Sequence, residues 1–226
     1  MAIGSIISLL ATASVVQPSG MKRALQDDSV PPLRYLGDAK LMLRQPELPV
    51  ADVTSSETTA NIEMLRRAMG KYGGIGIAAP QVGWWTRVFC FGIEKPNPRY
   101  PAAETIPFSV WINPTIETVE NEDTCWMWEG CLSVPGMRGW VERPSRCTLR
   151  GLDEHGRQQE VVLDGLAARI AQHEFDHLDG ILFPSRTPGV EFVVPQASMD
   201  QKEQWADDWP SKGSRHTALG QLSLER

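Results

Sequence analysis

The stretch RIAQHEFDHLDG (residues 169–180) holds two of the chain's four histidines, separated by four positions. Apolar residues recur at helical spacing through this region, which predicts a helix over 166–178 with His173 and His177 on one face. Two imidazoles so placed can share one metal ion. Glu174 points about 100° around such a helix, so it can reach a metal-bound water without ligating the metal. A helix with two exposed histidines gives the same pattern, so a metal site requires a third ligand elsewhere.

The sequence upstream of this helix predicts a second helix and several strands. Thr54 and Glu57 have the spacing of a capping box, and apolar residues at helical spacing follow them as far as Gly73, which predicts a helix over about 57–71. β-Branched and aromatic residues predict a strand over 87–93 and another over 109–116, the second with a turn at Asn113-Pro114. Residues 146–165 predict a hairpin with DEHG at its tip.

Short strands with one early and one late helix predict an α+β fold, in which antiparallel sheets pack around a central helix that bears the HExxH motif. We expect the catalytic domain to span residues 33–190. Residues 1–32 would form an N-terminal extension, either a targeting segment or the product of a misassigned start ahead of Met21. Residues 191–226 are polar and predict a tail with one short helix followed by disorder.

Composition restricts the partners and the location. The net charge of −6 argues against broad electrostatic binding to nucleic acid, and no apolar run reaches the roughly 18 residues of a membrane span. The four cysteines do not have the density of a disulfide scaffold, which favours a reducing compartment. Residues 1–20 lack the basic residues of a secretory or mitochondrial signal. We therefore expect a cytoplasmic protein, or an organellar one if residues 1–20 are a transit peptide.

The third ligand is not found downstream of the motif. In the metalloprotease pattern HExxHxxGxxH, Phe183 occupies the place of the third histidine, and neither Glu191 nor Glu203 lies in a convincing helical pattern. Upstream, the turn-rich segment WEGCLSVPGMRG (128–139) contains Cys131. A thiolate and two imidazoles would leave one coordination position open for water, as catalytic sites require. The alternative is that Cys131 is a small buried apolar residue, as Cys90 in the strand 87–93 is expected to be.

A glycine-rich segment, GGIGIAAPQVG (73–83), precedes the first predicted strand. It satisfies a relaxed dinucleotide-binding fingerprint, but that fingerprint must follow a strand and open a helix, and here a helix comes before it. No G-K-[ST] follows, which excludes a phosphate-binding loop. Its free backbone groups could instead pair with an extended peptide as an added strand would.

Three stretches in this order, GIGIAAPQ (74–81), EGCLS (129–133) and QHEFDH (172–177), resemble the three motifs of the peptide deformylases. The resemblance covers roughly residues 33–190. It implies an α+β metal-dependent hydrolase that removes the formyl group from the N-terminal methionine of newly synthesised proteins. The metal is usually Fe(II) in this family, and the donor set leaves zinc and nickel open. The implied partners are nascent formyl-methionyl polypeptides with transient ribosome contact, and neither a specific nucleic acid nor a membrane.

The resemblance also assigns roles to residues. The implied metal ligands are Cys131, His173 and His177. The implied catalytic groups are Glu174 as acid and base, and the Gln81 amide and Leu132 backbone N–H as oxyanion donors. The implied substrate-binding residues are Ile75, Gly76, Met127, Glu129, Arg138 and Leu166. Asp176 and Arg143 resemble a buried pair that braces the motif helix.

Arg169 departs from the family pattern, because an apolar pocket residue is often found at its position. We expect its alkyl stem to line the site while the guanidinium reaches water.

Two other functions remain as alternatives: an endopeptidase with the same metal chemistry, and a non-catalytic peptide- or ribosome-binding relative. The absence of the third protease ligand counts against the first. The intact motifs count against the second.

Overall fold

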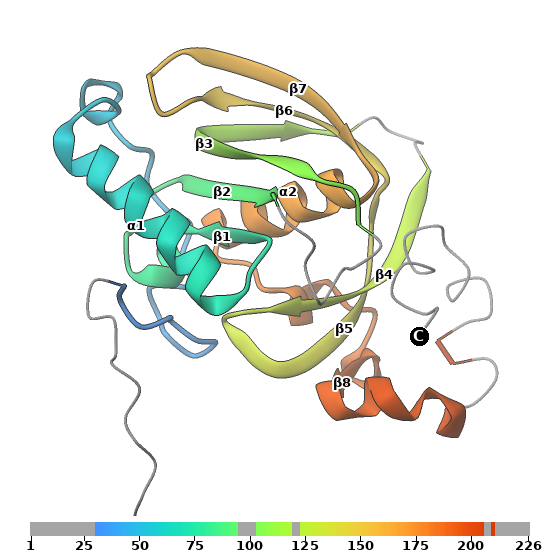
Figure 1. Cartoon of the computed structure of the whole chain (residues 1–226). Coiled ribbons are helices and arrows are strands. Elements are labelled where there is room, and N and C mark those ends of the chain that lie inside the picture. The colour runs from blue at the N-terminus through green and yellow to red at the C-terminus, as the bar shows by residue number, and fades with distance from the viewer. Residues whose placement is uncertain (1–29, 95–102, 119–122, 206–208, 211–226) are drawn as a thin grey trace, which may run out of the picture.

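Two antiparallel sheets and two α-helices make up the described part of the chain (Figure 1). The structure is a computed structural model that describes residues 30–94, 103–118, 123–205 and 209–210. The larger sheet has the order β1-β2-β3-β6-β7 and the smaller one β4-β5-β8. The strands are Gly76–Ala78 (β1), Val88–Ile93 (β2), Ile106–Glu117 (β3), Thr124–Cys131 (β4), Val134–Pro144 (β5), Arg146–Leu152 (β6), Gln158–Asp164 (β7) and Val193–Pro195 (β8). The predicted α+β class is confirmed.

Helix α2 (Gly165–Leu178) carries the HEFDH motif and lies between the two sheets. It contacts β1, β2 and β7 of the larger sheet and β5 of the smaller one. Figure 1 shows it behind β2, above the β4–β5 pair. The helix occupies the predicted residues within one position. Its placement brings the motif histidines to the boundary between the sheets.

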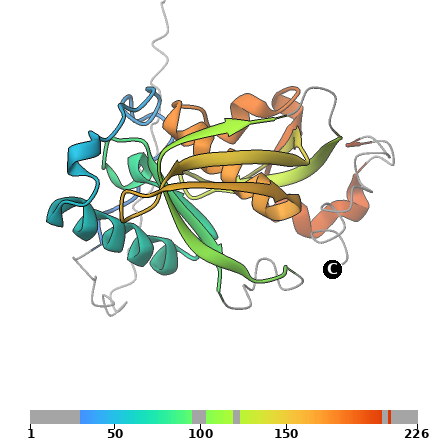
Figure 2. The same cartoon turned by 90° about the horizontal axis from the view of Figure 1, so that it is seen from above.

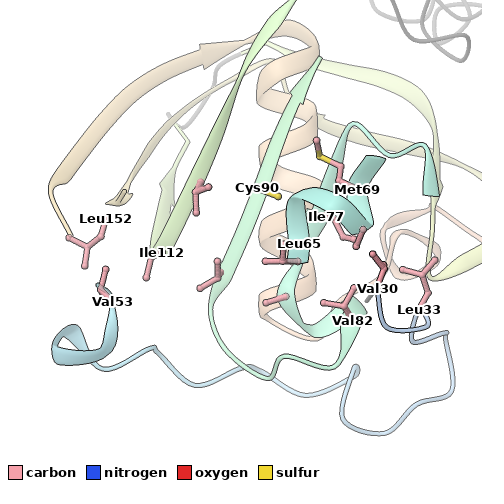
Figure 3. Close-up of a cluster of buried hydrophobic side chains, with 14 residues drawn as sticks. Val30, Leu33, Val53, Leu65, Met69, Ile77, Val82, Cys90, Ile112 and Leu152 are labelled. Atoms are coloured by element: carbon pink, nitrogen blue, oxygen red, sulfur yellow. The ribbon is translucent and has the colours of Figure 1, made fainter. Parts of the chain in front are cut away.

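Helix α1 (Ser56–Tyr72) packs on β1 through its apolar face. Figure 3 shows Leu65 and Met69 of this helix beside Ile77 and Cys90 of the neighbouring strands, in one buried cluster. The predicted N-cap is wrong by one residue: Ser55, not Thr54, caps the helix, and its side chain accepts a hydrogen bond from Thr58 N at 3.1 Å. Gly73 ends the helix as predicted, in the left-handed conformation at φ 67°.

Strand β3 (Ile106–Glu117) is longer than predicted at both ends, and the turn predicted at Asn113-Pro114 is wrong, because the strand continues through the dipeptide. The pairing of β3 with β6 shifts register between Ile112 and Thr115, so the dipeptide lies in a bulge. A bulge accommodates a proline because the missing N–H is not required there. Asn113 adopts a φ of 49°, and its side chain accepts from Leu48 N and donates to Leu48 O, both at 2.8 Å.

The segment 128–139, which composition marked as rich in turns, is largely a hairpin. Strands β4 and β5 pair from Thr124↔Pro144 to Cys131↔Val134, with a register shift between Glu129 and Cys131. Cys131 is thus the last residue of a strand, directly before the turn. This position holds its side chain at the edge of the small sheet.

The C-terminal residues add a third strand and an aromatic cluster to that sheet. Strand β8 pairs with β5, with Val194 opposite Arg138, and a 3₁₀ segment over Gln196–Gln204 follows. Aromatic rings join this segment to β4 in a cluster formed by Trp128, Phe192, Trp205 and Trp209. Figure 2 shows α1 and these C-terminal residues at opposite ends of the molecule.

The predictions of an N-terminal targeting segment in residues 1–29 and of disorder beyond residue 210 concern parts of the chain outside the described residues. Where the chain is described, no helix combines the length and apolar character needed to cross a membrane.

Candidate metal centre

The structure brings Cys131, His173 and His177 together. Cys131 Sγ lies 3.3 Å from His177 Nε2, and the ligand atoms of all three residues lie within 4.8 Å of one another. Ligand atoms around a tetrahedral ion with bonds of about 2.0–2.3 Å are separated by roughly 3.3–3.8 Å. The three atoms therefore fit one ion, and one sulfur with two nitrogens is a donor set that transition metals prefer.

The two histidines differ in their hydrogen-bond partners and in the direction of their pKa shifts. His173 Nδ1 donates to Glu129 Oε2 at 2.8 Å, which leaves Nε2 free for a metal. Burial lowers the pKa of His173, but the Cys131 sulfur and the Glu129 carboxylate outweigh it and raise the pKa well above its usual value. Burial, with the charges of His173 and Arg143, holds the pKa of His177 well below the usual value, so its ring is neutral and able to ligate.

Glu129 is buried, and both of its carboxylate oxygens are occupied. Oε1 accepts from Arg143 Nε at 2.6 Å and from Arg169 Nη1 at 2.8 Å, while Oε2 accepts from Arg143 Nη2 at 3.0 Å as well as from His173. Burial raises its pKa, but Arg143 and His173 outweigh that effect and lower the pKa well below its usual range. Glu129 is thus a fixed anion behind the imidazole.

Arg143 and Arg169 complete this buried network. Arg143 Nη1 donates to Asp176 Oδ2 at 2.8 Å, so the pair expected to brace the motif helix is in contact. The expectation for the Arg169 guanidinium is wrong. The side chain is only 4% exposed, and its guanidinium is held by Glu129, two backbone carbonyls and a cysteine rather than by water.

Glu174 lies on the cavity side of the helix and is 5% exposed. Its Oε2 atom is buried and has no hydrogen-bond partner among the described residues. Burial raises the pKa of its carboxyl to about 7, with Glu129 adding to the effect and His173 and Arg143 opposing it. A carboxyl that titrates near neutral pH can both accept and donate a proton.

Gly76 gives this carboxylate its space. A Cβ atom at Gly76 would lie 2.5 Å from Glu174 Oε1, so only glycine permits this approach of strand and carboxylate.

The Gln81 amide faces the same centre. Its Oε1 accepts from Ala78 N at 2.8 Å, which orients Nε2 toward Ser133 Oγ at 3.1 Å and Cys131 Sγ at 3.6 Å. Leu132 occupies the turn after Cys131. Both therefore lie beside the predicted ligands. Ser133, which holds the amide in place, was missed because one hydroxyl in a turn carries no pattern.

A cavity of about 500 Å³ opens above these groups. Its lining contains all six predicted substrate-binding residues: Ile75, Gly76, Met127, Glu129, Arg138 and Leu166. It also contains Tyr35, Tyr72 and Gln196, which sequence reasoning missed. Gln196 contacts the Arg138 guanidinium from the C-terminal segment.

A cysteine and two histidines with converging ligand atoms, beside an ionisable glutamate and a peptide-sized cavity, define a metal-dependent hydrolase. The polypeptide deformylase family model matches residues 31–192. The chain belongs to the polypeptide deformylase family, whose members remove the formyl group from the N-terminal methionine of newly made proteins.

Individual curated relatives support this family assignment. "Peptide deformylase 2" of Ralstonia nicotianae is 44% identical over 157 residues, covering 69% of this chain and 85% of that protein. "Peptide deformylase 1" of Prochlorococcus marinus is 46% identical over 146 residues, covering 64% and 74%.

Two solved structures are also similar. The Met-Ala-Ser-bound class I type b peptide deformylase of Acinetobacter baumannii has 38% identity and a TM-score of 0.66, covering 70% of this chain and 98% of that one. The peptide deformylase of Thermotoga maritima has 31% identity and a TM-score of 0.61, covering 71% and 99%.

Proposed function

We propose that this chain hydrolyses the formamide of formyl-methionyl polypeptides at the centre formed by Cys131, His173 and His177, with Glu174 as the general acid and base. One observation carries the proposal: the ligand atoms of Cys131, His173 and His177 lie within 4.8 Å of one another beside a cavity. Glu174, whose buried Oε2 has no hydrogen-bond partner among the described residues, lines the same cavity next to the glycine-rich strand. The catalytic domain is proposed to span residues 33–190.

The three ligands would hold one divalent ion, for which we propose Fe(II), with zinc and nickel as alternatives that the donor set also suits. When bound, the ion supplies a Lewis acid that makes water nucleophilic near neutral pH. His177 is neutral and would offer its nitrogen lone pair directly, whereas His173, which Glu129 holds in place, would have to lose a proton before it can ligate. The Nε2 atoms of the two histidines come from successive turns of one helix, so the ligand geometry depends on the helix itself.

Glu174 is the group that transfers protons in the proposed reaction. Its carboxylate accepts a proton from the attacking water as oxygen bonds to the formyl carbon. As the C–N bond breaks, the same group delivers that proton to the departing amine. The products are formate and a free methionine N-terminus. A pKa near 7 suits both directions of transfer.

The formyl oxygen gains negative charge during attack, and two N–H donors are available to it. We propose the Gln81 amide, oriented by Ala78 N, and the backbone N–H of Leu132. Loss of one such donor typically costs about 10²–10³ in rate.

The peptide itself is proposed to pair with the backbone of Ile75 and Gly76. Met127 and Leu166 would hold the methionine side chain, whose flexible thioether suits an apolar cavity. Glu129, although it lines the cavity, has both oxygens engaged, so we propose that it acts through His173. Arg138 would contact the peptide at the mouth.

For its setting, we propose nascent polypeptides as substrates, transient contact with the ribosome and a cytoplasmic location. An organellar location is the alternative if residues 1–20 direct import.

The test is formate release from formyl-Met-Ala-Ser by full-length protein purified without oxygen, with its metal content measured. Formate should appear in proportion to bound metal, and acetyl-Met-Ala-Ser should remain intact. Cleavage of internal peptide bonds without formate release would instead indicate the endopeptidase. Metal-loaded protein that releases no formate would refute the proposal.

A further inference from the structure

Arg169 lies one helical turn before His173, and its guanidinium points away from water into the interface between α2 and the small sheet. Nη1 donates to Glu129 Oε1 at 2.8 Å and to Val141 O at 3.0 Å. Nη2 donates to Cys125 O at 2.6 Å and contacts Cys125 Sγ at 3.2 Å. One side chain of the helix is thereby fixed to both β4 and β5.

This bridge joins the two elements that supply the metal ligands. Strand β4 ends in Cys131, and α2 carries His173 and His177. The contact with Cys125 O is made directly to the cysteine-bearing strand, six positions before the ligand. It therefore restricts how far the helix can move relative to that strand.

Arg169 also acts on the metal centre through Glu129, whose other hydrogen-bond partners among the described residues are Arg143 and His173. Arg143 is shared, because its Nη1 is committed to Asp176. Arg143 on β5 donates to both carboxylate oxygens, and Arg169 adds a second donor on Oε1 from helix α2. Glu129 is therefore tied to the helix that carries His173 as well as to the small sheet, which restricts the carboxylate from turning Oε2 away from His173 Nδ1. A buried carboxylate and guanidinium in such contact are costly to separate, because either group alone would remain buried and uncompensated.

We propose that Arg169 is a positioning residue of the metal centre, which clamps α2 to the β4–β5 hairpin and fixes Glu129 against the His173 imidazole. The inference rests on the metal site of the proposed function and adds to it a group that touches neither metal nor substrate. Residues that orient a ligating histidine typically change metal affinity by about 10–100-fold when replaced.

The test compares Arg169→Met with Arg87→Met in the full-length protein. Arg87 is a matched control, since it is also 4% exposed and also braces α2, donating to Leu178 O at 3.0 Å and to Asp179 Oδ1 at 2.7 Å. It contacts none of the proposed ligands. Both variants should lose stability, but only Arg169→Met should bind metal more weakly.

The readout is the transfer of Ni²⁺ from loaded protein to a competing chelator, with Co²⁺-loaded protein used to follow thiolate-to-metal absorption. Arg169→Met should weaken metal affinity about 10–100-fold and alter the absorption, while Arg87→Met should match the parent in both. Parental affinity in Arg169→Met, or equal loss in the two variants, would overturn the proposal.

Arg169→Lys provides a second measurement should the methionine variant fail to fold. Lysine keeps the charge but lacks the planar fork that reaches Glu129 and two carbonyls together. Its metal affinity should lie several-fold below that of the parent, and a parental value would overturn the clamp. Formate release by the parent is measured separately, so a failure of the proposed function is distinguishable from a failure of this inference.

Discussion

Replacing Glu174 by glutamine should impair catalysis and stabilise the metal-free fold at the same time. Glutamine keeps the size of the side chain but cannot take the proton from water, so formate release should fall by about 10²–10⁴. Metal content should stay at the parental level, because the carboxylate is not one of the three ligands.

The effect on stability follows from the burial of this carboxylate. The pKa rises from 4.5 to about 7, which corresponds to roughly 3 kcal/mol against the ionised form in the fold. A carboxyl with a raised pKa in the folded state contributes its stability below pH 4.5, and this contribution is lost as the pH rises to about 7. The free energy of unfolding of Glu174→Gln, relative to the parent, should therefore increase by about 3 kcal/mol between pH 4 and pH 8.

Denaturant unfolding of both metal-free proteins at the two pH values measures this difference, and a formate assay on the metal-loaded proteins measures catalysis. Glu63, exposed on α1, provides the control, because Glu63→Gln should change neither quantity. The reasoning is refuted if Glu174→Gln turns over formyl-methionyl peptides at close to the parental rate. It is also refuted if its stability relative to the parent is the same at both pH values.

Four further predictions concern the same centre. Cys131→Ser should lower the metal content or change the identity of the bound ion in elemental analysis, and a full complement with unchanged ligand spectra would remove Cys131 from the site. Gln81→Ala should reduce kcat by about 10²–10³ with KM close to the parent, and an unchanged kcat in steady-state assays would exclude the amide as an oxyanion donor. Gly76→Ala should displace the Glu174 carboxylate, because the new Cβ would lie 2.5 Å from Oε1. Formate release should fall by about 10²-fold while the metal is retained, and full activity in this variant would contradict the prediction. Lowering the pH from 7 to 5 should release metal, because the raised pKa of His173 lets protons compete with the ion for this ring, and protein that keeps its full metal complement after desalting at pH 5 would contradict this.

The sequence was sufficient to predict the α+β class and the helix of the HEFDH motif, because both depend on local spacing. Apolar periodicity places His173 and His177 on one face, and i, i+4 geometry is the same in any helix. The N-cap prediction was wrong because Thr54 and Ser55 both carry hydroxyls, and only the backbone decides which one accepts from Thr58 N.

The β4–β5 hairpin and the role of Arg169 depend on contacts between distant residues. Glycines and a proline in 128–139 mask the strand pattern that the pairing establishes. Arg169 meets Glu129 at a separation of 40 residues, and no local pattern reports such a partner. A charged residue between Ala168 and Ile170 on a buried helix was nevertheless a signal, because a buried guanidinium requires an acid.

Strand β8 lies just beyond the family-matched segment, which ends at residue 192. A fragment cut at that boundary would leave β5 as an open edge with unpaired backbone amides, and Trp128 without its contacts to Trp205 and Trp209. Exposed edges of this kind recruit other chains, so such a fragment would tend to aggregate. Expression of this enzyme should therefore extend at least through Pro210.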